Sequence, residues 1–92
     1  MIRSFKSEDA EAIFRRVGSR RFQSIEALVL RKLLLIEAAE RIDDLRIPPG
    51  NRLEKLKGDR AGQHSIRINR QWRICFRWTD DGAWEVEIVD YH

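Results

Sequence analysis

Two arginines, Arg67 and Arg73, occupy polar positions in a part of the chain where apolar and polar residues alternate. The alternation has a period of two from about His64 onward, which predicts antiparallel strands with one apolar face. Pairing Ile68 with Trp72 keeps both side chains on the apolar face and leaves a three-residue loop between them. This pairing sets Arg67 directly opposite Arg73. Two guanidinium groups on adjacent strands have the charge and the shape to hold a phosphate.

The next predicted hairpin gives the arginines of this face different neighbours. Pairing Trp78 with Trp84 leaves Asp80-Asp81-Gly82 as a three-residue loop, in which the glycine can adopt a positive φ. With this register the predicted cross-strand pairs are Phe76 with Val86, Arg77 with Glu85, Arg73 with Val89 and Trp72 with Asp90.

Like charges directly opposite each other in a sheet are unfavourable, by a few tenths of a kcal/mol up to about 1 kcal/mol. An anion bound between Arg67 and Arg73 would remove this cost, whereas Arg77 already has Glu85 opposite it. The alternative is that both arginines lie in water or reach Glu87 diagonally. The residues alone favour an anion-binding site at Arg67 and Arg73 and leave the solvated arrangement open.

Positive charge is concentrated in two parts of the chain, although the formal net charge is only +3. Between Arg52 and Arg77 there are eight lysines and arginines against two acids, Glu54 and Asp59. A second cluster lies nearer the N-terminus and consists of Arg15, Arg16, Arg20 and Arg21. Basic clusters on a small chain indicate an anionic partner, most often nucleic acid, with a solvated charged surface as the alternative.

Two helices are predicted before the sheet. Ser7 is a suitable N-cap for a first helix that Gly18 can end, and Ser24 is a suitable N-cap for a longer helix over residues 25–41. Pro48-Pro49 then ends helical structure. Additional short strands are predicted at residues 2–5 and 52–57. The fold class is therefore α+β, an antiparallel sheet of about four to five strands with the two N-terminal helices packed on its apolar face.

Length and composition fit a single folded domain over residues 1–92. Apolar residues make up 42% and charged residues 36% of the chain, which argues against disorder. No apolar run reaches the roughly 18 residues that a membrane span needs, and the N-terminus has no apolar signal-peptide segment. We therefore expect a cytoplasmic protein without membrane attachment.

The few sulfur and imidazole groups predict neither a metal site nor a cofactor. Two histidines and one cysteine lack the spacing of metal ligands, and a single cysteine excludes an internal disulfide. Cys75 is predicted to be a small buried side chain rather than a nucleophile. His64 begins the apolar side of a strand and is predicted to be a packing or edge residue.

Several segments together resemble the HigB branch of the RelE/ParE toxin superfamily, whose members are also known as plasmid-maintenance killer proteins. The resemblance rests on Leu56-Lys57-Gly58-Asp59-Arg60, on the strand that contains Arg67, on Trp72-Arg73 and on the terminal Asp90-Tyr91-His92, in this order. Pro48-Pro49-Gly50-Asn51-Arg52-Leu53 and Met1-Ile2-Arg3-Ser4-Phe5 are also similar to members of this branch. The resemblance implies an antiparallel sheet with two helices on one side, and cleavage of mRNA in the ribosomal decoding site.

The resemblance also implies an active site and a partner. The family's active-site residues correspond here to Lys57, Arg67, Arg73, Tyr91 and His92. The implied partner is a cognate antitoxin, usually a helix-turn-helix protein of the HigA type, which binds the toxin and represses the operon.

Cleavage of RNA without a metal uses the 2′-OH of the substrate as nucleophile. It needs a proton acceptor, a proton donor and positive charge beside the phosphate. The paired arginines would hold the phosphate, and His92 would protonate the leaving oxygen, because imidazole exchanges protons near neutral pH. Lys57 or Asp90 would accept the 2′ proton or stabilise charge. Tyr91 would stack on an unpaired base.

Because so few acid–base groups are present, we expect weak activity on free RNA, with ribosomal RNA needed to position the message. The side chains expected to contact RNA are Arg15, Arg16, Arg20, Arg21, Arg60 and Arg70. Two other functions remain open. One is inhibition of gyrase, as in the ParE-like branch, which generally lacks the catalytic set. The other is RNA or DNA binding without catalysis. Codon preference, the general base and the need for Lys57 also stay open.

Overall fold

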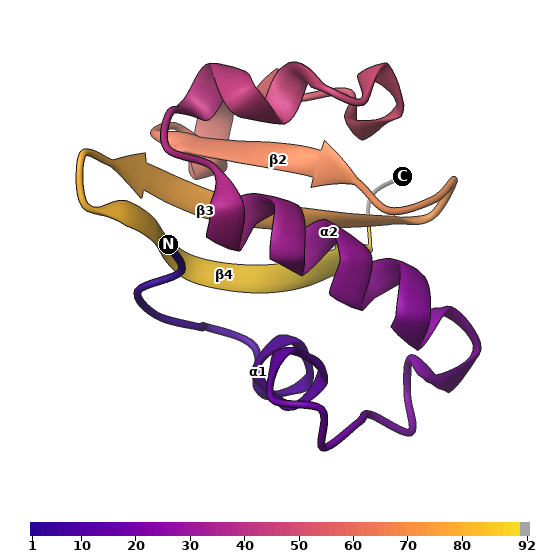
Figure 1. Ribbon diagram of the computed structural model, residues 1–92. Helices are drawn as coiled ribbons and strands as arrows, with labels where there is room; N and C mark the ends of the chain where they lie inside the picture. Colours follow the sequence, from indigo (N-terminus) through magenta and orange to yellow (C-terminus); the bar gives the residue numbers. More distant parts are fainter. Residues whose placement is uncertain (91–92) are drawn as a thin grey trace.

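The computed structural model describes residues 1–90, which form a four-stranded antiparallel sheet with two helices on one face (Figure 1). The strands lie side by side in sequence order. The elements are α1 Glu8–Phe14, α2 Glu26–Ala38, β1 Glu54–Lys55, β2 Gln63–Arg67, β3 Trp72–Thr79 and β4 Gly82–Asp90. Short 3-10 turns lie at Gln23–Ile25, Ile42–Arg46, Pro49–Asn51 and Gly58–Arg60. The predicted α+β class is confirmed.

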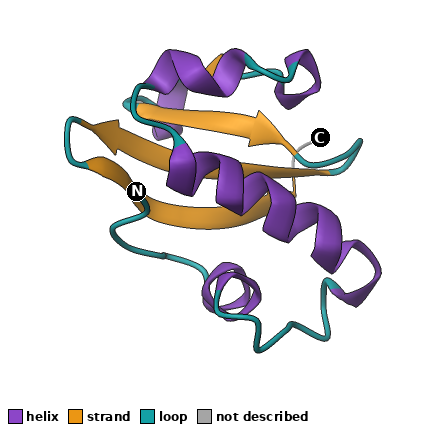
Figure 2. Cartoon of the chain, in the orientation of Figure 1, coloured by secondary structure: helices purple, strands orange, loops and turns teal. Residues whose placement is uncertain are grey.

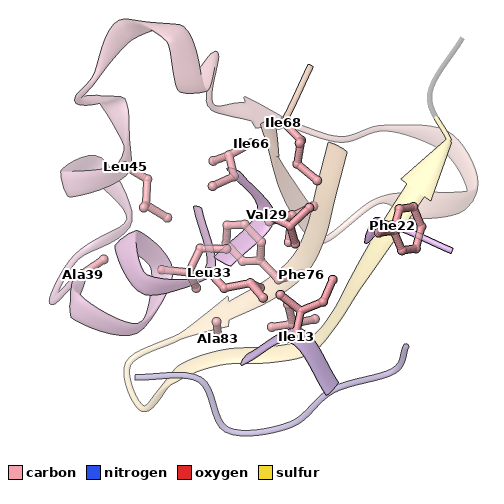
Figure 3. Packing of buried hydrophobic residues seen from close by; sticks show 13 residues of the cluster. Ile13, Phe22, Val29, Leu33, Ala39, Leu45, Ile66, Ile68, Phe76 and Ala83 are labelled. Atoms are coloured by element: carbon pink, nitrogen blue, oxygen red, sulfur yellow. The ribbon is translucent and has the colours of Figure 1, made fainter. Parts of the chain in front are cut away.

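The hydrophobic core lies between the sheet and the two helices (Figures 2 and 3). Ile66, Ile74 and Phe76 of the sheet are fully buried, as are Val29 and Leu33 of α2. Burying one side chain of this size contributes roughly 1.5–3 kcal/mol relative to leaving it exposed. The predicted apolar face of the strands is therefore the face that the helices cover, and the alternate residues point to the other side of the sheet.

The first helix begins as predicted and ends earlier. The hydroxyl oxygen of Ser7 accepts a hydrogen bond from the backbone N–H of Ala10 at 3.2 Å, which makes Ser7 the N-cap. We expected the helix to reach Gly18, but α1 ends at Phe14. The reason is that Arg16 adopts a left-handed conformation with φ of 65°, which no residue inside an α-helix has.

The second helix also differs from the prediction at both ends. Ser24 is not the N-cap but lies inside a 3-10 turn, and α2 begins after Ile25. At the other end, Ala39 is extended, and the helix stops at Ala38 rather than at residue 41. The carboxylate of Asp44 accepts the backbone N–H groups of the two following residues, 40 and 41, at 2.9 and 3.1 Å. A side chain that binds backbone donors in this way competes with continuation of a helix.

Within residues 1–90, neither helix has both the length and the apolar character that a membrane-spanning helix needs.

The predicted register of the first hairpin is confirmed. Arg67 pairs with Arg73 across β2 and β3. The loop between the strands is closed by Asn69, whose side-chain oxygen accepts the backbone N–H groups of Gln71 and Trp72, each at 2.9 Å. The alternation of apolar and polar residues and the turn at Asn69 therefore favour the same register.

The predicted register of the second hairpin is correct away from the turn and wrong beside it. Trp72 pairs with Asp90 as predicted, but Trp78 pairs with Ala83 rather than with Trp84. A β-bulge after Cys75 separates the two parts of the hairpin: the predicted register holds from Trp72 to Cys75 and is shifted by one residue from Arg77 to Thr79. Glu85, which lies in the bulge, has φ of 55°. The pairs predicted between Phe76 and Val86 and between Arg77 and Glu85 are likewise absent, because Arg77 is opposite Trp84.

The N-terminal segment lies along the outer edge of β4 at this bulge. Ile2 and Phe5 form isolated parallel bridges with Ala83 and Val86 in place of the continuous strand predicted for residues 2–5. Between the bridges, the backbone N–H of Glu85 donates to the hydroxyl of Ser4 at 2.8 Å, so a side chain replaces one ladder hydrogen bond. The segment therefore protects the edge of β4.

The tight approach of the N-terminus predicts that Gly82→Ala destabilises the fold. Gly82 has φ of +129°, and a Cβ there would clash with the carbonyl oxygen of Met1. That oxygen accepts the N–H of Ala83 at 2.9 Å, so the N-terminal segment would have to move. We expect a loss of about 1–3 kcal/mol in the free energy of unfolding, measured by urea denaturation. Gly50→Ala is the control, because its added Cβ meets nothing within 4 Å. Equal stability of the two variants would contradict the prediction.

Candidate active site

The residues predicted to bind an anion lie on the polar face, by which we mean the face of the sheet opposite α1 and α2. Arg67 and Arg73 sit beside each other there, because they alternate with the core residues Ile66 and Ile74. Next to them, one row of residues crosses all four strands, namely Glu54, Ser65, Cys75 and Glu87. The polar face therefore brings two cations, a hydroxyl, a thiol and two carboxylates into neighbouring positions.

Arg73 is a buried cation with a fixed orientation. The whole residue is only 9% exposed. Its Nε donates to the hydroxyl of Ser65 at 2.8 Å, and its Nη2 donates to the carbonyl oxygens of Arg52 at 2.7 Å and of Ser65 at 3.4 Å. Burying a charged group is costly unless hydrogen bonds compensate for the lost water. For Arg73 the open alternative of a side chain lying in water therefore does not apply.

Arg67 is held differently. It is half-buried, and its Nε donates to the carbonyl oxygen of Asn69 at 3.1 Å. Arg73 thus leans back along β2 toward Ser65, whereas Arg67 leans forward toward the turn. The backbone register is as predicted, but the two side chains do not face each other as a pair of forks. Arg67 has the greater freedom to turn toward a bound anion, because it is less buried than Arg73.

Asp90 ends β4 beside the turn between β2 and β3. It is exposed, pairs with Trp72, and accepts a hydrogen bond from the side-chain amide of Gln71 at 3.1 Å. The predicted proton donor His92 and the predicted stacking residue Tyr91 lie outside the described residues. Register therefore brings Asp90 to the same end of the sheet as Arg67, but on the face of Trp72 and not on the polar face.

Lys57 lies farther away along the sheet. It is exposed and stands three residues beyond Glu54, which pairs with Ser65. Strand β1 ends at Lys55, so Lys57 lies in the connection that leads into the Gly58–Arg60 turn. The antiparallel pairing of β1 with β2 takes this connection toward the start of β2 and away from Arg67.

Residues 3–92 match a family described as the RelE-like toxin of the type II toxin-antitoxin system HigB. The chain belongs to this family. The resemblance recognised in the sequence is thereby confirmed.

Two relatives of this chain carry the name HigB. Toxin HigB-1 of Vibrio cholerae is 53% identical over 60 residues, which are 65% of this chain and 63% of that protein. Endoribonuclease HigB of Proteus vulgaris is 32% identical over 94 residues and covers 100% of both chains. The match to the Vibrio toxin thus spans less than two thirds of that protein's length.

Solved structures show the same fold. The YoeB-YefM complex from Staphylococcus aureus contains a chain with a TM-score of 0.61 and 22% identity, covering 100% of this chain and 98% of that one. The YoeB/ParE toxin from Agrobacterium tumefaciens has a TM-score of 0.57 and 23% identity, with coverage of 99% and 98%. At this level of identity the likeness concerns the fold alone.

In this HigB-family chain, five of the six arginines predicted to bind RNA are exposed. The cluster Arg15, Arg16, Arg20 and Arg21 lies in the connection between α1 and α2, and Arg70 is exposed in the loop between β2 and β3. The guanidinium of Arg21 stands 5.1 Å from the ring of Phe22 and 5.4 Å from the ring of Trp72, the residue opposite Asp90. This contact places part of the cluster beside the end of β4.

Two arginines of the polar face are ion-paired, as are Arg15 with Glu11 at 2.9 Å and Arg21 with Asp9 at 4.0 Å in the cluster between the helices. Arg60 lies 3.5 Å from the carboxylate of Glu87 and donates to the side chain of Gln63 at 3.1 Å. Arg77 binds Glu85 at 3.1 Å although the two are not directly opposite. The predicted carboxylate neighbour of Arg77 is therefore present. Arg60, which we predicted to bind RNA, already has a carboxylate partner.

Cys75 and His64 behave as packing residues, as predicted. Cys75 is fully buried, and burial raises the pKa of its thiol, which keeps it in the unreactive protonated form. The ring of His64 stacks on Phe76 with 6.4 Å between the ring centres. Burial lowers the pKa of His64, and the charges of Lys55 and Arg46 lower it further. Its Nδ1 is buried without a hydrogen-bond partner in the described part of the chain.

Sequence reasoning missed the contacts of Arg73 with Ser65 and with the carbonyl of Arg52. Ser65 could have been found, because it lies on the same strand and the same face as Arg67, two residues away. The carbonyl oxygen of Arg52 has no sequence signal, since any residue supplies a carbonyl. That oxygen is in place because Arg52 adopts a left-handed conformation with φ of 45°.

The lowered pKa of His64 predicts that acid destabilises the fold in a defined range of pH. The unfolded chain binds a proton at His64 near pH 6.5, more readily than the folded protein does. The free energy of unfolding should therefore decrease as the pH falls through 6.5 toward the lowered pKa, and be fully restored above 6.5. Urea denaturation between about pH 5 and pH 8 measures this. His64→Phe should show a weaker dependence on pH, and an unchanged dependence would contradict the assignment.

Proposed function

We propose that this toxin-family chain is a metal-independent endoribonuclease that cleaves mRNA on the ribosome. The observation that carries the proposal is Arg73, a buried guanidinium held by Ser65 and by the carbonyl of Arg52 on the polar face. A fixed cation of this kind is suited to stabilise charge that develops on a phosphate. The proposal is supported by the full-length similarity to the Proteus vulgaris protein named Endoribonuclease HigB.

In the proposed reaction, the 2′ oxygen of the substrate attacks the adjacent phosphorus as it loses its proton. The bond from phosphorus to the 5′ oxygen breaks, which leaves a 2′,3′-cyclic phosphate and a free 5′ hydroxyl. Negative charge grows on the non-bridging oxygens during this step. Arg73 stabilises that charge from a fixed position, and Arg67 turns toward the phosphate from the neighbouring strand.

Two proton transfers accompany the attack. We assign the donation to the 5′ oxygen to His92, because an imidazole carries a transferable proton near neutral pH. Lys57 or Asp90 accepts the 2′ proton or stabilises charge; both are exposed and so accessible to RNA. Tyr91 stacks on a base of the message. Each positioned acid–base group contributes roughly 10²–10⁴-fold to such a rate.

The ribosome would position the message, because the chain by itself offers few acid–base groups. The exposed side chains of Arg20, Arg21 and Arg70 would contact phosphates of ribosomal RNA and so orient the site on the message. Arg15 and Arg16 would contribute to the same contact. The proposed partners are thus mRNA on the ribosome and a cognate antitoxin, which we infer to be of the helix-turn-helix type. A toxin acting on translating ribosomes would work in the cytoplasm.

The second candidate function is inhibition of gyrase, because the fold is shared with a protein titled YoeB/ParE toxin. The presence of Arg67, Arg73, Tyr91 and His92 favours RNA cleavage over this alternative. A non-catalytic nucleic-acid-binding module is the third. The three differ in their products, because the nuclease leaves new mRNA ends, the gyrase inhibitor leaves broken DNA, and the binding module leaves neither.

The role of Arg73 predicts that Arg73→Ala abolishes cleavage, with a loss of about 10²-fold or more in the single-turnover rate. Because Arg73 is buried and hydrogen-bonded, the variant should also lose about 1–3 kcal/mol of stability. Circular dichroism and antitoxin binding check that it is folded. Arg77→Ala is the matched control, since Arg77 is an exposed arginine of the same strand with a carboxylate partner. A folded Arg73→Ala protein that cuts as fast as Arg77→Ala would remove Arg73 from the mechanism.

Dependence on the ribosome is tested by comparing cleavage of the same message when it is free and when it is bound to ribosomes. Purified protein should leave the free message largely uncut and should cut it when it is loaded on ribosomes with a filled P site. Raising the salt concentration should weaken ribosome binding, because the contacts are to phosphates. Primer extension maps the ends. Equal rates on free and ribosome-bound message would show that the chain carries a complete site by itself, and broken DNA without new RNA ends would support gyrase inhibition instead.

A further inference from the structure

A lysine is buried on α2, away from the residues of the proposed reaction. Lys32 is 9% exposed, and its Nζ donates to the side-chain oxygen of Asn51 at 2.6 Å. Burial lowers the pKa of Lys32, and the neighbouring charge of Arg31 lowers it further. Lysine is seldom buried without a specific partner, because removing its charge from water is costly. A leucine or methionine would fill the same space without that cost. The ammonium group is therefore expected to have a role beyond packing.

The partner of Lys32 is a fully buried side chain that binds three groups at once. Asn51 is 0% exposed. While its oxygen accepts from Lys32, its Nδ2 donates to the carbonyl oxygens of Leu45 at 3.1 Å and of Ile47 at 3.3 Å. Its backbone N–H donates to the carbonyl of Pro48 at 2.9 Å. Asn51 therefore ties α2 to both sides of the turn that leads into β1.

That turn ends on the carbonyl group that holds the proposed catalytic arginine. Arg52 follows Asn51 directly, and its backbone N–H donates to the carbonyl of Pro49 at 3.0 Å. The left-handed φ of 45° at Arg52 is unfavourable for a residue with a side chain and persists only where the surroundings enforce it. The carbonyl oxygen of Arg52 accepts from Nη2 of Arg73 at 2.7 Å. A continuous path of contacts thus leads from Lys32 through Asn51 and Arg52 to Arg73.

We propose that Lys32 and Asn51 are positioning residues of the active site, which fix the carbonyl of Arg52 and thereby the guanidinium of Arg73. The inference rests on the proposed function in that Arg73 acts on the phosphate. Neither residue touches the substrate. Their effect is on the rate of the chemical step, because an error of about 1 Å in the placement of a charged group can cost about 10²-fold in rate.

The first test measures how well the Arg73 Nε–H is protected from exchange with water, and it does not depend on activity. Hydrogen exchange of the Arg73 Nε–H, which is bonded to Ser65, is followed by nitrogen-detected NMR of the purified chain. In Lys32→Met this exchange should become at least about tenfold faster. Arg31→Met is the matched control, because it removes the same charge from an exposed neighbour on the same helix. The Nε–H of Arg77, bonded to Glu85, serves as the internal reference in every sample.

A second variant keeps the test valid if Lys32→Met does not fold. Asn51→Asp preserves the volume and the acceptor for Lys32 but removes the donor to the carbonyls of Leu45 and Ile47. It should accelerate the exchange of the Arg73 Nε–H in the same direction. Unchanged exchange at Arg73 in the folded variants, or an equal acceleration at Arg77, would overturn the proposal.

The second test is a double-mutant cycle in single-turnover cleavage on programmed ribosomes. Lys32→Met should lower the rate at saturation about tenfold and leave the half-saturating ribosome concentration unchanged. In an Arg73→Ala background the same substitution should have no further effect, because the path ends at Arg73. An equal loss in both backgrounds would overturn the proposal. Should Arg73→Ala cut at the normal rate, the proposed function would fail, while the exchange measurement would still decide the positioning role.

Discussion

The burial of one guanidinium group, that of Arg73, is the constraint on which the polar face of the sheet depends. A cation at 9% exposure is stable only if polar atoms replace its water shell. Two of the replacing oxygens belong to Ser65 on the adjacent strand, and a third is the carbonyl of Arg52 at the turn before β1. Strand pairing, the turn and the position of the charge are therefore coupled, so an error in any one of them leaves a charged group unsatisfied. This coupling explains how a sheet of four short strands can hold a cation in one orientation.

The sequence predicted the parts of the fold that depend on side-chain alternation. Because residues on one face alternate strictly, burying Ile66, Ile74 and Phe76 left one register for the first hairpin, and that register pairs Arg67 with Arg73. The register beside the second turn could not be derived in the same way. There Glu85 takes a left-handed conformation and the hydroxyl of Ser4 replaces a ladder bond, so the outcome depends on a segment 81 residues away in the chain.

The helix ends and the orientation of the site were less predictable for a related reason. Gly18 and Ser24 are typical of helix ends, yet the left-handed Arg16 and the carboxylate of Asp44 determined where the helices stop. Both effects are local competitions for backbone groups, and their outcome is set by tertiary packing. The face on which Arg67 and Arg73 lie was predictable from the alternation of the strands. The direction in which Arg73 leans was not, because one of its partners is a main-chain carbonyl.

The arginines of the polar face divide according to the groups that orient them. Arg60 and Arg77 are bound to carboxylates, which offset their charge and fix them as parts of the sheet. The hydrogen bonds from Arg73 to Ser65 and Arg52 end on a hydroxyl and a main-chain carbonyl, which fix the direction of the guanidinium. Electrostatic stabilisation of a phosphate requires a cation in a fixed position, and these oxygens provide that position for Arg73. The position of the Arg52 carbonyl depends in turn on the amide at position 51. A carboxylate there would pair with Lys32 more strongly, but it would lose the donor that holds the turn and add negative charge beside the carbonyl that orients Arg73.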